Sequence, residues 1–305
     1  MSLRFKGVIP PMITPFNKNG DINYEAFAFN IEKWNKTSLS GYLILGSNSE
    51  AAYLSEEEKL KSIEITVKTA RKDVVVLAGT GMESERETIR FTNLAADMGV
   101  NAALILTPSY YTSEMSADAM INFFTNVADN VKIPVLLYNV PKFTHLNIQD
   151  TALKKLAAHK NIIGMKDSTG DIMQLVRFQN LVKDEDFQIL TGTASAWFPA
   201  LTLGVKAGIF ALANCSPNEL AEVQDLYESY ELSQAESLYR KLFVLNTAVT
   251  VTYGVPGLKY ACDLMGYKGM DVRSPLLELS DAKKSEIEKI FSYSQATSKQ
   301  SNRAQ

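Results

Sequence analysis

Short runs of apolar residues recur along the first 215 residues, and amphipathic stretches with a helical period separate them. The runs are continuous rather than alternating, which is typical of parallel strands buried on both faces. We therefore expect eight strands: Gly7–Ile13, Tyr42–Leu45, Val74–Ala78, Ala102–Leu106, Val135–Tyr138, Ile162–Met165, Gln188–Leu190 and Ala207–Leu212.

The stretches between and after these runs carry start and stop signals of helices. Ser55 and Glu58 form the S-x-x-E pattern of a capping box in front of a helix. Gly99 follows another helical pattern and is expected to end it, because glycine adopts the left-handed conformation that a C-terminal stop requires. Ser216 followed by Pro217 predicts the N-cap and the first residue of a later helix.

The alternation of strands and helices predicts the fold class. Eight strands with seven intervening helical stretches fit an α/β (βα)8 TIM barrel better than an open doubly wound sheet, which usually has five or six strands. Residues 1–215 are expected to form the barrel and residues 216–293 a C-terminal helical extension packed on it. Residues 294–305 are polar and lack large apolar side chains, so we expect a disordered tail there.

Composition and charge exclude several classes of protein. The chain has 305 residues, of which 46% are hydrophobic and 21% charged, and its formal net charge is −3. Phosphate binding requires a basic footprint, so this balance argues against a nucleic-acid partner. No apolar run reaches the ~18–20 residues that a membrane span needs. The N-terminal residues show no secretory signal pattern, and we therefore expect a cytoplasmic protein.

The signatures of metals and cofactors are weak. Cys215 and Cys262 are too few and too distant in sequence for a disulfide framework or a C-x-x-C site, and the two histidines do not cluster. The segment Gly79–Ser84 follows a strand and opens a helix, as a dinucleotide fingerprint does. Its third glycine is replaced by Ser84, and no acidic residue ends a second strand about 20 positions later. We therefore expect no metal and no cofactor.

Lys166 is the most informative candidate for catalysis. It directly follows the buried run Ile162–Met165, at the end of a strand where barrel enzymes place their catalytic residues. Desolvation favours the neutral amine, which is the form that attacks a ketone to give a Schiff base. An ion-paired lysine is the commoner occupant of a strand end. By strand parity Ser168 should point to the same side as Lys166, whereas Asp167 should point away.

Other strand ends offer groups for proton transfer and for anion binding. Tyr138 ends the preceding strand, where a phenol can pass protons to a bound carbonyl compound or simply pack its ring at the rim. The turn Gly46–Glu50 offers successive backbone N–H groups suited to a carboxylate, and it is equally compatible with an ordinary strand-to-helix loop.

Taken together, these residues resemble the pyruvate-dependent class I aldolase family that includes dihydrodipicolinate synthase and N-acetylneuraminate lyase. The resemblance covers residues from about 5 to 290. It rests on segments that occur in the family's order: GSNSE at 46–50, TPSYY at 107–111, YNVP at 138–141 and GMKDSTGD at 164–171.

The resemblance implies a homotetrameric enzyme, a dimer of dimers, that works without metal or cofactor. It implies that Lys166 forms the Schiff base with pyruvate and that Tyr138 shuttles protons. Backbone N–H groups of Ser47 and Asn48 would hold the pyruvate carboxylate. The other implied site residues are Ser47 and Tyr111 as relay partners, Tyr111 from a neighbouring subunit, and Asn48, Ser168, Gly192 and Phe210 at the substrate.

Two departures from the family pattern bear on the substrate. Phe143 stands where the dihydrodipicolinate synthases carry an arginine, and phenylalanine cannot pair with the carboxylate of aspartate semialdehyde. Lys142 could partly substitute for that arginine. Ser49 replaces a glycine of the turn and could alter its backbone.

Several segments resemble 4-hydroxy-2-oxoglutarate aldolase more closely: Gly164–Asp171, Ala211–Asn214, Gly254–Lys259 and Ser274–Leu276. From this resemblance and from Phe143, the preferred interpretation is reversible cleavage of 4-hydroxy-2-oxoglutarate to pyruvate and glyoxylate. The alternatives are 4-hydroxy-tetrahydrodipicolinate synthase, which condenses pyruvate with aspartate semialdehyde, and a 2-keto-3-deoxy sugar acid aldolase. A barrel that binds a keto acid without turnover is the non-enzymatic alternative.

Overall fold

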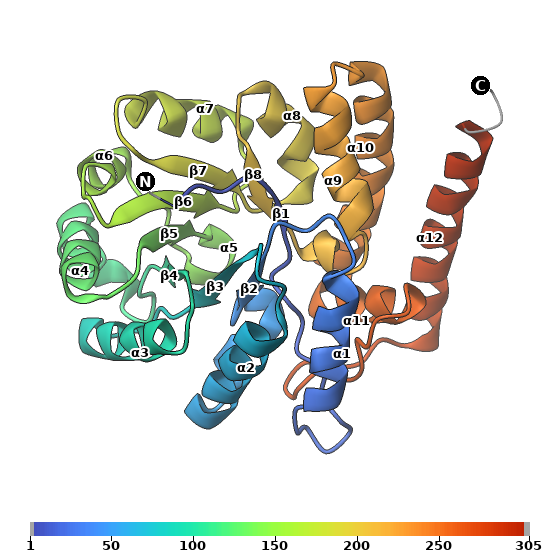
Figure 1. Ribbon diagram of the computed structural model, residues 1–305, viewed down its shortest axis with the longest axis horizontal. Helices are drawn as coiled ribbons and strands as arrows, with labels where there is room; N and C mark the ends of the chain where they lie inside the picture. The colour runs from blue at the N-terminus through green and yellow to red at the C-terminus, as the bar shows by residue number, and fades with distance from the viewer. Residues whose placement is uncertain (1–2, 302–305) are drawn as a thin grey trace.

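The computed structural model describes residues 3–301 and shows a ring of parallel strands surrounded by helices (Figure 1). The eight strands are hydrogen-bonded in the order β1-β8-β7-β6-β5-β4-β3-β2. The predicted TIM barrel is thus confirmed. The strands are β1 (Gly7–Ile9), β2 (Gly41–Ile44), β3 (Val75–Gly79), β4 (Ala102–Leu106), β5 (Val135–Asn139), β6 (Ile162–Asp167), β7 (Gln188–Thr191) and β8 (Ala207–Ile209).

The barrel is closed between its first two strands by the residues that follow β1. Met12 N–H donates to the Leu43 carbonyl at 2.9 Å, and Leu43 N–H donates to the Pro10 carbonyl at 3.0 Å. The expected first strand extends to Ile13, whereas β1 ends at Ile9. Pro10 has no backbone N–H and the regular ladder ends before it, but Pro11 still forms a parallel bridge with Leu43.

The helices that cover the barrel follow their strands along the chain. They are α1 (Tyr24–Trp34), α2 (Glu56–Thr69), α3 (Glu85–Asp97), α4 (Ala117–Asn130), α5 (Pro141–Thr144), α6 (Asp150–Ala157), α7 (Ile172–Leu181) and α8 (Trp197–Thr202). Short 3-10 turns lie at η1 (Ser47–Ser49), η2 (Ala51–Tyr53), η3 (Thr112–Glu114), η4 (Ala194–Ala196) and η5 (Ala211–Asn214).

The C-terminal extension is helical, as expected, and Figure 1 shows it along one side of the barrel with α12 outermost. Its elements are α9 (Pro217–Glu228), α10 (Leu232–Asn246), the π-helical turn η6 (Thr247–Thr252), α11 (Gly254–Leu264) and α12 (Asp281–Ser301). Helix α12 has its end at Ser301, within the segment 294–305 for which we expect disorder, and that expectation stays a prediction. Residues 302–305 lie outside the described residues.

The local sequence signals are mostly confirmed. The Ser55 hydroxyl accepts a bond from Glu58 N–H while the Glu58 carboxylate accepts one from Ser55 N–H, which is a complete capping box. Gly99 has a φ of 99° directly after the C-cap of α3. Helix α9 begins at Pro217, but the Ser216 side chain does not cap it. The ψ of Ser216, 57°, lies outside the extended region that N-cap residues usually adopt.

Strand alternation divides the buried side chains into a layer inside the barrel and a layer beneath the helices. Leu136, Tyr138 and Leu190 belong to the lumenal layer. Ile209 also faces the lumen, and its neighbour Phe210 belongs to the outer layer. The Phe210 ring packs edge-on against Trp197 of α8 with ring centroids 5.0 Å apart. The expected contact of Phe210 with substrate can therefore come only from its backbone.

This location predicts a structural effect for Phe210→Ala. The ring is fully buried, so its removal should lower the free energy of unfolding by about 3–5 kcal/mol in denaturant titrations. Phe243→Ala is the matched control, because that ring is 43% exposed and should cost much less. Equal losses for the two variants would contradict the outer-layer packing of Phe210.

Candidate active site

Lys166 and Tyr138 lie opposite each other on neighbouring strands inside the barrel. They are partners in the register of β5 and β6, and their side chains are 3% and 6% exposed. The Lys166 Nζ lies 4.2 Å from the centroid of the Tyr138 ring. A buried amine beside a phenol is an arrangement that can form a carbinolamine and move its protons.

The surroundings of Tyr138 favour ionisation of its phenol. Burial by itself raises the pKa of Tyr138, but the positive charge of Lys166 and polar interactions with the Ser47, Ser168 and Lys166 side chains outweigh it. The net result is a pKa below the ordinary 10.0. A phenol with a lowered pKa is better suited to pass a proton near neutral pH.

Ser168 is positioned by strand parity and by a neighbouring glycine. As predicted, it points to the same side as Lys166, whereas Asp167 points outward and accepts a bond from the Asn139 side chain. The Ser168 Oγ is buried without a well-formed hydrogen bond to the described residues. A Cβ at Gly192 would lie 1.9 Å from that oxygen, so only glycine leaves room for it. A bound ligand would satisfy this hydroxyl.

Ser49 connects the turn after β2 to the segment that follows β1. Its Oγ accepts a bond from Gly46 N–H at 3.1 Å and donates to the Met12 carbonyl. Thr14 Oγ1 donates to the Ser49 carbonyl at 2.7 Å. Ser49 thus ties the loop down rather than disrupting it. Residues 47 and 48 begin the 3-10 turn η1, where backbone N–H groups have no intrahelical acceptor and remain available.

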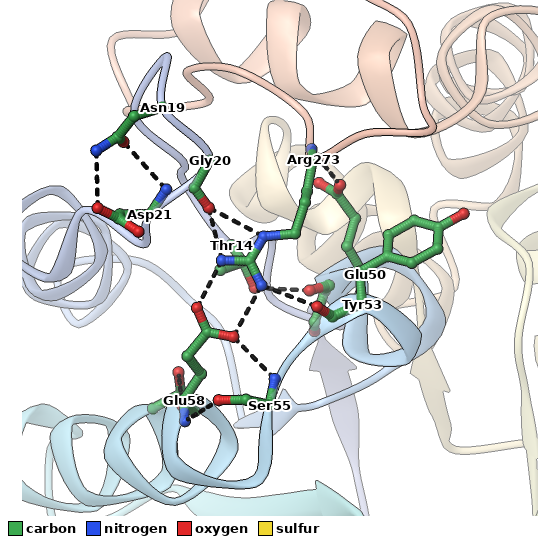
Figure 2. A network of polar contacts seen from close by, with 11 residues as sticks. Thr14, Asn19, Gly20, Asp21, Glu50, Tyr53, Ser55, Glu58 and Arg273 are labelled. Carbon is green, nitrogen blue, oxygen red and sulfur yellow. Dashed lines mark hydrogen bonds and ion pairs between the residues drawn. The ribbon is translucent and has the colours of Figure 1, made fainter.

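A buried ion pair connects this turn to the C-terminal extension. Lys259 Nζ in α11 lies 2.8 Å from the Glu50 carboxylate, and both side chains are 1% exposed. Arg273 N–H donates to the same carboxylate at 2.9 Å, while the Arg273 guanidinium binds Glu58 and the Gly20 carbonyl (Figure 2). Glu50 itself adopts a left-handed conformation with a φ of 55°. The sequence indicated Glu50 only as part of a turn and gave no reason to pair it with Lys259.

Breaking this pair should be costly, because it leaves an uncompensated buried carboxylate. We expect Lys259→Met to lower the free energy of unfolding by about 3–5 kcal/mol. Lys68→Met, which removes a 72% exposed partner of Glu64, should change it by less than about 1 kcal/mol. Denaturant unfolding of both variants measures the difference, and a small effect of Lys259→Met would show that Glu50 is not held by this pair.

Tyr111 is not brought to the site by its own chain. The Tyr110 and Tyr111 rings are 77% and 69% exposed and pack edge-to-face, with centroids 5.0 Å apart. Their loop is held at its start by the Glu83 carboxylate, which accepts from Ser109 N–H and Tyr110 N–H at 2.9 Å each. Among the described residues Tyr111 makes no contact with Tyr138, so its role as a relay depends on a second subunit and stays a prediction.

The weak cofactor signatures have structural explanations. A Cβ at Gly79 would lie 2.2 Å from the Leu45 carbonyl, and one at Gly81 would lie 3.0 Å from Leu106 N, so both glycines are needed for strand packing.

Cys215 and Cys262, distant in sequence, are buried side by side. Burial raises the pKa of the Cys262 thiol well above its ordinary value, and a hydrogen bond with Cys215 adds to this.

Residues 3–301 contain neither a candidate metal cluster nor a candidate membrane span. No group of three or more histidine, cysteine, aspartate or glutamate side chains in this range could hold a metal ion. No helix in the same range is long and apolar enough to cross a bilayer.

The chain matches the model of the dihydrodipicolinate synthetase family over residues 4–294. It belongs to that family. A 4-hydroxy-tetrahydrodipicolinate synthase of Methanoculleus marisnigri is 33% identical over 289 residues, which are 94% of this chain and 98% of that protein. Its counterpart in Thermodesulfovibrio yellowstonii is 35% identical over 287 residues, covering 94% and 97%.

Solved structures show the same relationship. A dihydrodipicolinate synthase of Bacillus anthracis superposes with a TM-score of 0.90 at 25% identity, covering 95% of this chain and 98% of that one. A prophage protein of the family from E. coli K12, solved in complex with pyruvate, has a TM-score of 0.90 at 28% identity, with 95% and 99% covered. This chain is accordingly a carbon–carbon lyase of the pyruvate-dependent class I aldolase type.

The comparisons bear differently on the two substrate hypotheses. The similar proteins bear the name 4-hydroxy-tetrahydrodipicolinate synthase, which was our alternative. They give no support to 4-hydroxy-2-oxoglutarate, which was our preferred substrate. The preference rests on Phe143 and on segments similar to 4-hydroxy-2-oxoglutarate aldolase, and neither identifies the acceptor, because enzymes with different acceptors share the fold and the reaction class.

Proposed function

We propose that this enzyme condenses pyruvate with aspartate semialdehyde through a Schiff base on Lys166. The observation that supports the chemistry is the buried register pair of Tyr138 and Lys166, with the amine over the phenol ring. The names of relatives that align over nearly the whole chain support the choice of acceptor.

The proposed sequence of steps uses Lys166 as nucleophile and Tyr138 as proton carrier. The neutral amine attacks C2 of pyruvate, and Tyr138 moves a proton from the nitrogen of the adduct to its oxygen, which gives the carbinolamine. A second proton, passed through Tyr138, protonates the hydroxyl, and water leaves to give the iminium. Loss of a proton from the methyl carbon gives the enamine. The enamine carbon then bonds to the aldehyde carbon, whose oxygen takes up a proton, and addition of water to the resulting iminium releases the product and the Lys166 amine.

The loop and the strand ends would orient the substrate for these steps. The free N–H groups at 47 and 48 suit the pyruvate carboxylate. Ser47, which interacts with the Tyr138 phenol, would continue the proton relay. Ser168 Oγ would bind a polar substrate atom in the space left by Gly192. Tyr111 of a neighbouring subunit would complete the relay, in the homotetramer that we propose.

A specific side chain favours a second candidate, the 4-hydroxy-2-oxo acid aldolase. Phe143 lies on α5, directly after β5, and its ring is 55% exposed. The nearby Lys142 Nζ lies 5.7 Å from the centroid of that ring. An apolar residue here offers no bidentate partner for the carboxylate of aspartate semialdehyde, which is separated from the aldehyde carbon by two carbons. Glyoxylate carries its carboxylate directly on the aldehyde carbon and is the shorter, competing acceptor.

Trapping with borohydride tests the shared chemistry. We expect pyruvate and borohydride to add a single label to the protein, as measured by its intact mass, and peptide mapping of the digested protein to locate that label at Lys166. The Lys166→Ala variant should remain unlabelled. Tyr138→Phe should still be trapped but should turn over about 10²–10⁴-fold more slowly, because it lacks the proton carrier. Labels spread over surface lysines, or no label at all, would refute the proposal and favour a non-catalytic keto-acid binder.

Substitution of Phe143 distinguishes the acceptors. If aspartate semialdehyde is the substrate, Phe143→Arg should raise its kcat/KM roughly 10–100-fold, the value of a hydrogen bond to a charged group. Lys142→Arg is the matched control, because it adds a guanidinium at the neighbouring position and not at position 143. Cleavage of 4-hydroxy-2-oxoglutarate by the parent enzyme at a kcat/KM far above that for aspartate semialdehyde would instead select the second candidate.

A further inference from the structure

The residues that follow the reactive pair form a second register pair on the opposite side of the sheet. Asn139 and Asp167 are partners across β5 and β6, directly after Tyr138 and Lys166. The Asn139 Nδ2 donates to Asp167 Oδ1 at 2.7 Å, and the two residues are 0% and 4% exposed. Alternation along a strand thus places a polar contact behind each reactive side chain.

Asp167 is the common acceptor of a buried network, which we call the outer polar cluster. Gln174 Nε2 in α7 donates to Asp167 Oδ1 at 3.3 Å, and Thr169 Oγ1 donates to Oδ2 at 2.5 Å. Asn139 also donates to Asn147 Oδ1 at 2.7 Å, and Asn147 donates to Gln174 Oε1 at 2.7 Å. The cluster consists of Asn139, Asn147, Asp167, Thr169 and Gln174.

Main-chain bonds connect the cluster to the substrate side of the barrel. Ser168 N–H donates to the Asn139 carbonyl at 2.9 Å, and Gly192 N–H donates to the Asp167 carbonyl at 2.6 Å. These are bonds at the ends of three adjacent strands, where the regular ladder stops. A shift of Asp167 would therefore move Ser168 and Gly192 as well as its chain neighbour Lys166.

The charge of Asp167 is not balanced by a cation in contact. Within the described residues no ion pair includes its carboxylate, and burial raises the pKa of Asp167 although Thr169, Asn139 and Gln174 donate to it. A buried carboxylate without a cation opposes folding, so stability does not explain it. Buried carboxylates with a shifted pKa concentrate at functional sites.

We propose that Asp167 is a positioning residue of the active site, which acts through Asn139 to hold Tyr138 and Lys166 in register. The inference rests on the proposed function. Its hydrogen bonds, rather than its charge, fix the spacing between amine and phenol at the strand ends. It touches neither the amine nor the substrate, and its effect reaches them through the backbone of β5 and β6.

Exchange of the methyl protons of pyruvate in D2O tests this without any acceptor. The exchange requires iminium and enamine formation only, and NMR follows it on the full-length protein. We expect Asp167→Ala to slow exchange and borohydride trapping by about 10²-fold, which is the effect of misplacing a reacting group by about 1 Å. The pyruvate concentration that gives the half-maximal rate should change by a smaller factor than the rate itself. Asn139→Ala removes the β5 partner of the same hydrogen bond and should slow exchange and trapping to a similar extent. This second variant tests the proposal if Asp167→Ala does not fold.

Asp167→Asn separates hydrogen bonding from charge. Its Oδ1 can still accept from Asn139 and Gln174, and its amide can donate to the Thr169 hydroxyl. We expect exchange close to the parent rate, because the bonds from Asn139 and Gln174 are kept. Gln224→Ala is the structural control, because Gln224 is 3% exposed and bonds the Lys206 carbonyl far from the reactive pair. It should lower Tm without slowing exchange.

The outcomes separate this inference from the proposed function. A parent enzyme that neither exchanges nor is trapped at Lys166 would refute the proposed function itself. If the parent exchanges and both Asp167→Ala and Asn139→Ala exchange equally fast, the positioning role is wrong. An Asp167→Asn variant as slow as Asp167→Ala would show that charge, and not hydrogen-bonded geometry, is what the site needs.

Discussion

The register between β5 and β6 is the constraint on which the active site depends. It places Tyr138 beside Lys166 inside the barrel and, one residue later, Asn139 beside Asp167 outside it. A slip of one residue would exchange the two sides and put a carboxylate and an amide where the amine and phenol now lie. The pairing contains one irregularity, between Val135 and Leu136, where the register shifts by one residue of β6. Beyond that point it is unbroken to Asn139 and Asp167, so this shift determines which side chains of β6 lie opposite those of β5.

The C-terminal extension contributes to the site, although its residues lie far along the chain. Lys259 and the Arg273 backbone hold the carboxylate of Glu50, and Glu50 ends the turn that offers free N–H groups. A left-handed conformation is strained for a glutamate, and these contacts hold Glu50 in it. The barrel and the extension therefore act as one structural unit at this edge.

The residues that we propose for the chemistry and for the choice of acceptor lie in different parts of the molecule. The amine and phenol are buried on strands, where packing fixes their geometry. Phe143 lies on a short helix after β5 and is largely exposed, so this position can be substituted with little effect on the core. Sites that differ at such exposed positions let one fold serve several functions.

The sequence by itself determined the barrel and the side of its strand that Lys166 shares with Ser168, opposite Asp167, because continuous apolar runs and the two-residue period of a strand are local properties. It also indicated Tyr138 and the turn at 46–50, each at a strand end. Only the tertiary structure decided that Phe210 packs against Trp197, that Cys215 lies beside Cys262, and that Lys259 neutralises Glu50. Those contacts join residues distant in the chain, and no periodicity encodes the partner of a buried side chain, since burial depends on how whole elements pack against one another.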